Sequence, residues 1–357
     1  MAFFVLNTRV GYKIFDSLAA GFRRLYSFSD AGINFIFGNL IDPTALWGFI
    51  FAVKVVPIII FFGALMSLLF HFGIIQLFVK LLGFLIRPIL GTSGAETLCA
   101  VANSILGPTE APLLVKKYLK GMTDSEMLAL MIAGMSTITA SVLAVYGSMG
   151  VSMVHMITAS VMSIPGSLLV SKILIPETKI PETAAGNHIE MKRDTSNFLD
   201  AIAAGTSDGL KLAANIAAML LAFISLMAMA DFLLLSTIGI SLNDIFAIIF
   251  SRVAYLLGIV PQDRSAAGAL LGQKLVINEL VAYSNFVKTT LTVRSKAILT
   301  YALCGFSNIS VIGILIGGVS SLAPNKRGIL TKLGWKALLG GTLVNLINAA
   351  IAGLLIS

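Results

Sequence analysis

The sequence contains 357 residues, of which 57% are hydrophobic and only 12% are charged, and its mean hydropathy is +0.94. Apolar runs of about 20 residues or more dominate it. This length crosses the hydrocarbon core of a bilayer, so the composition excludes an ordinary soluble protein. The net charge of +8 does not indicate a nucleic-acid partner, because the basic residues are spread over loops and form no stripe with interleaved aromatics. Cys99 and Cys304 lie in apolar segments, which argues against a disulfide framework or a zinc site.

The first half of the chain predicts an interfacial segment followed by one membrane unit. Residues 1–44 mix aromatic, small and charged side chains, which favours a helix region lying at the membrane surface. Within residues 45–174, the stretch 95–119 predicts two helical arms that are each too short to cross, so we expect a re-entrant hairpin. Thr123 to Glu126 has the pattern of a capping box that opens a helix. The predicted spans of this unit are 48–75, 124–149 and 152–174.

A polar linker separates this unit from a second one that repeats its plan. Residues 175–211 contain two prolines and many charged side chains, and the distribution of lysine and arginine over the loops predicts that this linker is cytoplasmic. Residues 212–357 predict a second hairpin at 264–288 and three further spans. Because each unit has an odd number of spans, the two units must have opposite orientations. The predicted fold is therefore an all-α polytopic membrane protein, an inverted repeat of three spans plus one re-entrant helical hairpin each. The spans of the second unit are 212–235, 295–320 and 332–355.

Two glutamates inside apolar stretches are the main functional signal. A carboxylate at membrane depth costs about 2.5 to 3.5 kcal/mol on insertion scales, so it usually faces a partner, a water-filled cavity or a substrate. Glu110 and Glu279 are 169 residues apart, and each is followed by an apolar helix that small polar residues are predicted to break. Thr137 and Asn308, in these two helices, are 171 residues apart. This near-constant offset indicates a duplicated unit with one acid at each hairpin tip. Inverted repeats with broken helices are the design of secondary transporters, in which freed helix ends hold substrate or ion.

The surroundings of the first hairpin predict a cation site. Asn103, Thr137 and the carbonyls freed around Leu106 and Ile138 supply neutral oxygens, which suit a small hard cation such as sodium. Sodium is the favoured coupling ion, and a proton is the alternative. The structural alternatives are that Asn103 caps the hairpin and that Thr137 bonds back to its own helix.

The polar side chains near both tips predict the class of solute. Ionised Glu110 and Glu279 suit a neutral solute rich in hydroxyl or N–H donors, because charge-assisted hydrogen bonds contribute about 1.5 to 3 kcal/mol each. Phe306 offers an aromatic face, although packing is an equally good explanation for it, and Asn308 offers a donor and an acceptor. A sugar joined to a heterocycle fits this set of groups.

At these residues the chain resembles the concentrative nucleoside transporter family, in its bacterial type. The motifs that carry the resemblance are Gly-Pro-Thr-Glu-Ala-Pro at 107–112, Asn-Glu-Leu-Val-Ala-Tyr-Ser at 278–284 and Ala-Leu-Cys-Gly-Phe-Ser-Asn at 302–308. The resemblance implies a homotrimer with a scaffold and a moving transport domain that works by elevator-like alternation. It also implies the following roles: Thr109 and Glu110 on the nucleobase side with Val142 nearby, Glu279 and Asn308 on the ribose, Phe306 lining the pocket, and Asn103, Leu106, Thr137 and Ile138 at sodium.

The chain departs from the family pattern in three places. Pro108 replaces a glutamine that contacts the base in many members, so the base preference does not carry over. Val311 replaces a common ribose-contacting serine, for which the adjacent Ser310 is a candidate substitute. The sequence also begins where the family finishes an earlier span, so we expect at least two N-terminal helices to be absent.

Two other classes of function compete with transport. An intramembrane enzyme would use the glutamate pair as acid and base, but no nucleophile constellation or metal triad accompanies the pair in the sequence. A channel or a transport-dead sensor would show flux without a cation gradient, or binding without flux. We therefore predict that the protein is not an enzyme but a multi-pass secondary transporter of the plasma (inner) membrane, which imports nucleosides by cation symport without a further cofactor.

Overall fold

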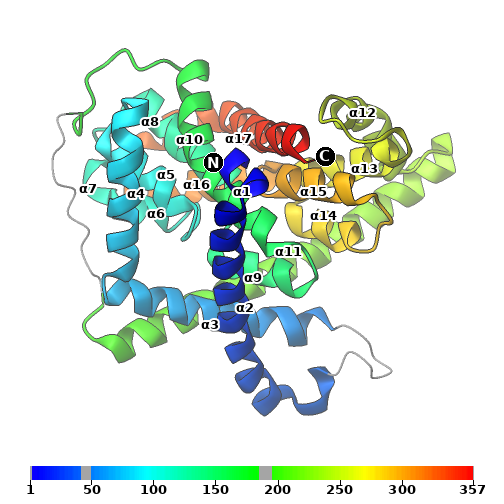
Figure 1. Cartoon of the computed structure of the whole chain (residues 1–357), viewed down its shortest axis with the longest axis horizontal. Coiled ribbons are helices and arrows are strands. Elements are labelled where there is room, and N and C mark those ends of the chain that lie inside the picture. Colours follow the sequence, from blue (N-terminus) through cyan, green and yellow to red (C-terminus); the bar gives the residue numbers. More distant parts are fainter. Residues whose placement is uncertain (1, 42–49, 185–194, 357) are drawn as a thin grey trace.

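The computed structural model describes residues 2–41, 50–184 and 195–356, and throughout these ranges the regular secondary structure is helical (Figure 1). The prediction of an all-α fold is confirmed. The helices, in chain order, are α1 (Ala2–Asn7), α2 (Arg9–Phe37), η1 (Gly38–Ile41), α3 (Phe51–His71), α4 (Ile74–Leu90), α5 (Gly94–Asn103), α6 (Ala111–Leu114), α7 (Lys116–Leu119), α8 (Asp124–Ser136), α9 (Ala140–Ser148), α10 (Met153–Leu174), α11 (Phe198–Ile238), α12 (Leu242–Leu256), η2 (Pro261–Asp263), α13 (Arg264–Val276), α14 (Glu279–Phe286), α15 (Val293–Leu303), α16 (Ile309–Leu322), η3 (Pro324–Lys326) and α17 (Arg327–Leu355).

Five helical segments in the described ranges are long and apolar enough to cross a membrane. A helix rises about 1.5 Å per residue, so about 20 residues cover the hydrocarbon core. The membrane class predicted from composition is confirmed by these segments. They are α3, the α8–α9 pair (Asp124–Ser148), α10, α11 and the segment Pro324–Leu355, which contains α17.

The N-terminal region is helical, as the sequence predicts, and most of it belongs to the long helix α2. In α2, the side chain of Thr8 accepts a hydrogen bond from Gly11 N and caps the helix. Its buried residues include Phe15, Ala19 and Ile33, while most of its other side chains are exposed. One stripe of α2 therefore packs on the body of the protein. Its placement at the membrane surface stays a prediction.

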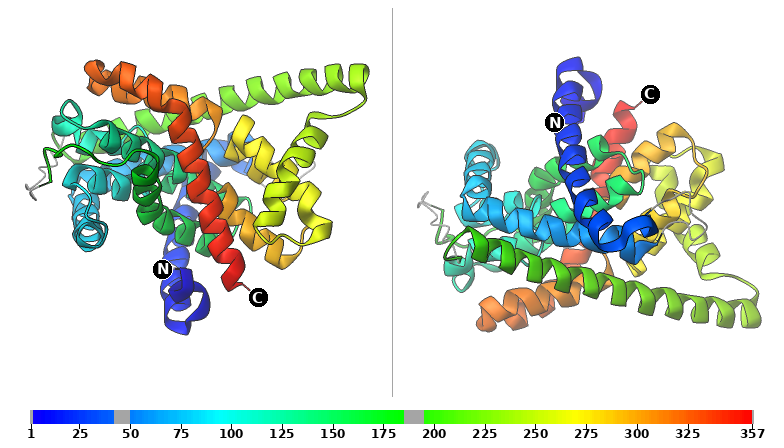
Figure 2. Two further views of the ribbon diagram at one scale, coloured as in Figure 1. Left: turned by 90° about the horizontal axis from the view of Figure 1, so that it is seen from above. Right: turned by 90° about the horizontal axis from the view of Figure 1, so that it is seen from below.

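The polar linker is shorter than the sequence predicts, because α11 already begins at Phe198. The Asn197 side chain caps this helix by accepting from Asp200 N at 2.9 Å. Gly205 then packs so tightly on α3 that a Cβ atom there would lie 2.5 Å from the carbonyl oxygen of Gly63. Figure 2 shows α11 running alongside α3 and extending beyond it. Residues 198–211 are thus a helix whose small residues pack on α3 and whose polar side chains are exposed, and not a loop. Part of the predicted linker, residues 185–194, lies outside the described residues.

Two predicted spans are interrupted in the middle, as their small polar residues indicate. Helix α8 begins at the predicted capping box, in which Thr123 and Glu126 exchange side-chain to backbone hydrogen bonds, and it ends at Ser136. The chain is extended through residues 137–139 before α9 begins, and a second break at residues 304–308 separates α15 from α16. Backbone groups at such breaks lack intrahelical partners and must be satisfied by other groups.

Short helices coincide with both predicted hairpins. Helices α5, α6 and α7 fall within the first predicted hairpin and its start, and α13 and α14 fall within the second. Thr109 precedes the second arm of the first hairpin but does not cap it: α6 starts at Ala111 with Glu110 at the cap position, and no side chain forms a capping hydrogen bond there. Re-entry into the membrane and the inverted orientation of the two units stay predictions.

Candidate functional site

Glu279 is held by side chains from two other helices. It is the first residue of α14, which Asn278 caps by accepting from Val281 N at 2.9 Å. The Tyr146 hydroxyl of α9 donates to Glu279 Oε1 at 3.2 Å, and Asn308 Nδ2 donates to Glu279 Oε2 at 2.9 Å. Glu279 is only 7% exposed. The carboxylate therefore lies where the second predicted hairpin meets both broken helices.

Asn308 is oriented by its own helix. Its side-chain oxygen caps α16 by accepting from Val311 N at 3.2 Å, and it also accepts from Ser310 Oγ at 2.7 Å. This fixes the amide nitrogen toward Glu279. Of the predicted substrate residues, the structure joins Glu279, Asn308 and Ser310 in one hydrogen-bonded chain.

The predicted base-side residues lie in different surroundings. Thr109 and Glu110 are exposed, and within the described ranges the Glu110 side chain forms no hydrogen bond or ion pair. Val142 is buried in α9, and Phe306 is half-buried in the second break, where its N–H donates to Thr137 O at 3.2 Å. The two glutamates of the sequence pattern thus differ: Glu279 is buried and bonded, and Glu110 is open.

The four predicted sodium residues lie around the first break. Thr137 Oγ1 donates to Asn103 O at 3.0 Å and to Ala133 O at 2.8 Å. Asn103 Nδ2 donates to Cys99 O at 3.0 Å, but Asn103 Oδ1 is buried and has no partner in the described part of the chain. Leu106, in the loop after α5, and Ile138, in the break after α8, are both buried.

An unpaired buried oxygen costs about 1 to 3 kcal/mol, so Asn103 Oδ1 fits a ligand of a bound cation. Thr137 also donates to Ala133 O of its own helix, as the structural alternative predicts. The unpaired Asn103 oxygen is therefore stronger support for a cation site than the Thr137 hydroxyl is.

Sequence reasoning missed three polar residues of this region. Tyr146 donates to Glu279, and Lys274 of α13 is buried, with only 4% of its surface exposed. Asn345 of α17 bridges both breaks, because its Nδ2 donates to Ser136 O and to Cys304 O, each at 2.8 Å. The available signal was a lone polar side chain inside an apolar helix, which usually marks a functional contact.

Three family models together match most of the chain. The model described as the C-terminus of the Na⁺-dependent nucleoside transporters matches residues 155–353, and the corresponding N-terminal model matches residues 1–40. A model described as a nucleoside-recognition gate matches residues 52–153. Glu279, Asn308 and Lys274 all fall in the C-terminal model, and Asn103 and Thr137 fall in the gate model.

Similar proteins are found in bacteria and mammals. An uncharacterised transporter of Haemophilus influenzae is 42% identical, over 99% of this chain and 88% of its own length. The nucleoside permease NupC of Helicobacter pylori is 41% identical, over 98% of this chain and 87% of its own. The sodium/nucleoside cotransporter 1 of Rattus norvegicus is 35% identical, over 99% of this chain and 58% of its own length.

Solved structures of a protein called CNTnw have the same fold. Its inward-facing, substrate-bound structure superposes with a TM-score of 0.96 at 38% identity and covers 100% of this chain and 89% of that one. An outward-facing variant of CNTnw gives a TM-score of 0.93 at 37% identity, and the match covers 99% of this chain and 88% of that one.

Proposed function

The chain belongs to the Na⁺-dependent nucleoside transporter family, and we propose that it imports nucleosides through the inner membrane by coupling their entry to sodium. The names of the Helicobacter and rat relatives support a nucleoside substrate, and the rat name supports sodium. Sodium entry supplies about 2.3 kcal/mol per charge for each 100 mV of membrane potential. This is enough to drive uptake against a concentration gradient.

The buried Glu279 carboxylate is the observation that carries the substrate assignment. Tyr146 and Asn308 each occupy one of its oxygens, and an ionised carboxylate has about four acceptor positions, so lone pairs remain for ribose hydroxyls. Asn308 and Ser310 lie beside these positions and would add further contacts to the sugar. An anionic solute would be repelled, which favours a neutral nucleoside.

Thr109, Glu110, Val142 and Phe306 are the proposed contacts on the nucleobase side. The exposed side chains of Thr109 and Glu110 are open to a solute, and Phe306 offers its ring for stacking. Pro108, which stands beside them, cannot donate a side-chain hydrogen bond to a base. For this reason the proposal names nucleosides as a class and assigns no preference between purines and pyrimidines.

Asn103 and Thr137, with the carbonyls of Leu106 and Ile138, are the proposed sodium ligands. The orphaned oxygen Asn103 Oδ1 supports this assignment, because a cation would satisfy it. All four ligands are neutral oxygens, as sodium prefers. A bound ion would also tie the end of α5 to the break after α8, and would thereby link ion binding to the shape of the substrate site.

The transport cycle is proposed to alternate between two states of a domain that contains both hairpins, within a homotrimer. The existence of inward-facing and outward-facing structures of CNTnw supports two states for this fold. The breaks in α8–α9 and α15–α16 would move with the hairpins, since Thr137 donates to Asn103 O of the first hairpin and Asn308 donates to Glu279 of the second.

The test is uptake of radiolabelled uridine, cytidine, adenosine and inosine into proteoliposomes under imposed sodium or proton gradients. We expect accumulation above the external concentration when sodium is high outside, and its collapse when a sodium ionophore is added. Accumulation that follows only the proton gradient would assign the proton as coupling ion. Equilibration without accumulation would refute symport, and chemical conversion of the nucleoside would indicate an enzyme.

A further inference from the structure

Lys274 is a buried lysine whose amino group donates hydrogen bonds to neutral oxygens. Within the described ranges no carboxylate oxygen lies within 4.0 Å of its ammonium group. Lys274 Nζ instead donates to Ala302 O at 2.8 Å and to Asn345 Oδ1 at 2.7 Å. A buried charge is retained only where oriented polar groups compensate for lost water. The surroundings of Lys274 Nζ therefore have the chemistry of a monovalent-cation site.

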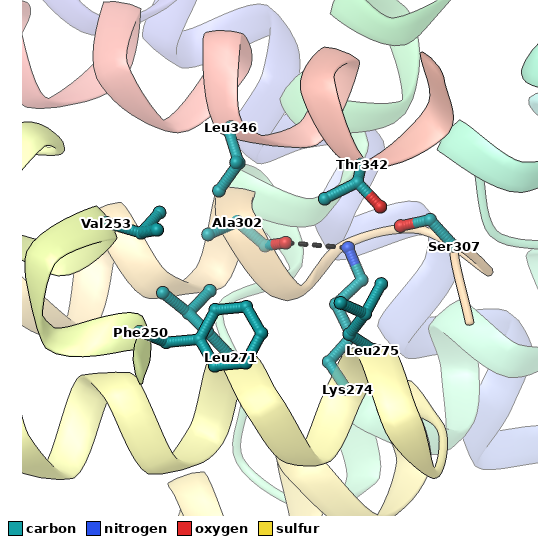
Figure 3. A pocket seen from close by; sticks show the side chains of 9 residues that line it. All are labelled: Phe250, Val253, Leu271, Lys274, Leu275, Ala302, Ser307, Thr342 and Leu346. Atoms are coloured by element: carbon teal, nitrogen blue, oxygen red, sulfur yellow. Dashed lines mark hydrogen bonds between the residues drawn. The ribbon is translucent and has the colours of Figure 1, made fainter. Parts of the chain in front are cut away.

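Two hydroxyl oxygens lie in the same cavity as the Lys274 amino group. Lys274, Ser307 and Thr342 line one cavity of about 40 Å³, into which the lysine ammonium and both hydroxyls point (Figure 3). Ser307 Oγ donates to Asn345 Oδ1 at 2.9 Å, whereas Thr342 Oγ1 is buried without a partner in the described structure. The remaining walls are apolar. About 10 to 15 Å³ of such space holds one water-sized particle, so the cavity has room for a small ion or water beside the ammonium.

The position of Lys274 corresponds to that of Asn103 in the first half of the chain. Asn103 lies seven residues before Glu110, and Lys274 lies five residues before Glu279, so each stands shortly before the acid of its hairpin. Asn103 ends α5 and contacts the break after α8, while Lys274 lies in the last turn of α13 and contacts the end of α15. One half therefore presents an orphaned amide oxygen at this position, and the other half presents a covalently attached amino group.

We propose that Lys274 is a tethered cation that occupies a second cation site, so that only the Asn103 site exchanges its ion during transport. This inference rests on the proposed symport function. A tethered charge travels with the moving domain in both directions, so it contributes no net charge to the cycle. The protein would then move one positive charge per nucleoside. A free ion in the same cage would add a second charge, which at 100 mV raises the accumulation limit about 50-fold.

The test compares Lys274→Asn with Lys274→Met in proteoliposomes. The asparagine recreates the residue type of Asn103 and vacates space for an ion. The methionine removes the charge but fills the same volume with an apolar chain, and so serves as the matched control. The charge moved per nucleoside is obtained from the membrane potential at which net uridine flux reverses under a fixed sodium gradient. The Hill coefficient for sodium is measured in parallel.

We expect one charge per nucleoside and a Hill coefficient near one for the unmodified protein and for Lys274→Met, and values near two for Lys274→Asn. A charge ratio of one in Lys274→Asn, or a ratio of two in Lys274→Met, would overturn the inference. Should Lys274→Asn fold but not transport, its melting temperature must rise more steeply with sodium chloride than that of the unmodified protein, relative to choline chloride. An unchanged slope, or a failure to fold at every sodium concentration, counts against the tethered cation.

The failure of the proposed function would look different. If the unmodified protein ignores sodium, the assigned coupling ion is wrong. The melting temperature of Lys274→Asn in sodium chloride against choline chloride still tests whether the vacated cage binds a cation.

Discussion

Replacing Glu279 with glutamine removes one charge and keeps the size of the side chain. The glutamine oxygen can accept from Asn308 Nδ2, and its amide group can then donate to the Tyr146 hydroxyl, so both present contacts have a replacement. Folding should therefore survive. What is lost is the ionised acceptor for a nucleoside hydroxyl. A hydrogen bond to a charged group contributes about 1.5 to 3 kcal/mol, so nucleoside binding should weaken about 10-fold to 150-fold.

The assay has two parts. Uridine accumulation by Glu279→Gln proteoliposomes should fall to the level of empty vesicles, and the Kd for uridine in detergent should rise at least tenfold while the melting temperature changes by only a few degrees. Tyr146→Phe is the control, because it removes one neutral donor and leaves the charge, and it should weaken binding only about 2-fold to 10-fold. Wild-type accumulation with an unchanged Kd in Glu279→Gln would refute the assignment of this carboxylate to the substrate.

Three further changes test the surrounding structure. Asn103→Ala should raise the sodium concentration for half-maximal uptake about tenfold, whereas Ser104→Ala, whose hydroxyl bonds only Val101 O, should leave it unchanged; equal responses would remove Asn103 from the ion site. Gly305→Ala should lower the yield of folded protein and its melting temperature, because Gly305 has φ +156° and a Cβ there would lie 2.4 Å from Asn345 Oδ1; Gly313→Ala, where a Cβ meets nothing within 4 Å, is the comparison, and equal yields would contradict the packing argument. Asn345→Ala leaves the carbonyls of both breaks and the buried lysine short of partners and should destabilise the fold by about 2 to 5 kcal/mol, measured as a large drop in melting temperature; an unchanged melting temperature would show that the bridge is dispensable.

Several elements could be predicted from local sequence because their causes are local. The capping box at Thr123 and Glu126 needs only residues three apart, and α8 begins there. Small polar residues at 137–139 and 304–308 predicted the helix breaks, because such residues compete with backbone hydrogen bonds. The apolar runs predicted membrane helices because the length and hydropathy of a run are also local properties of the sequence.

The start of α11 could not be predicted in this way. Its first turns are polar, and polar composition predicts a linker. The helix exists there because Gly205 and Gly63 allow two backbones to touch, and that contact joins residues more than one hundred positions apart. Local propensity carries no information about such a partner.

The sequence by itself determined the membrane class, the family motifs and the acids at 110 and 279, since these depend on composition and spacing, and the duplicated plan is a prediction from the same spacing. Only the tertiary structure decided that Glu279 is buried against Tyr146 and Asn308 while Glu110 is exposed. It also decided that Lys274 lies inside the protein and that a single asparagine of the last helix joins both breaks. The physical reason is that burial and hydrogen bonding depend on which distant segments meet, and residues at the same place in two repeats can acquire different neighbours when the chain packs.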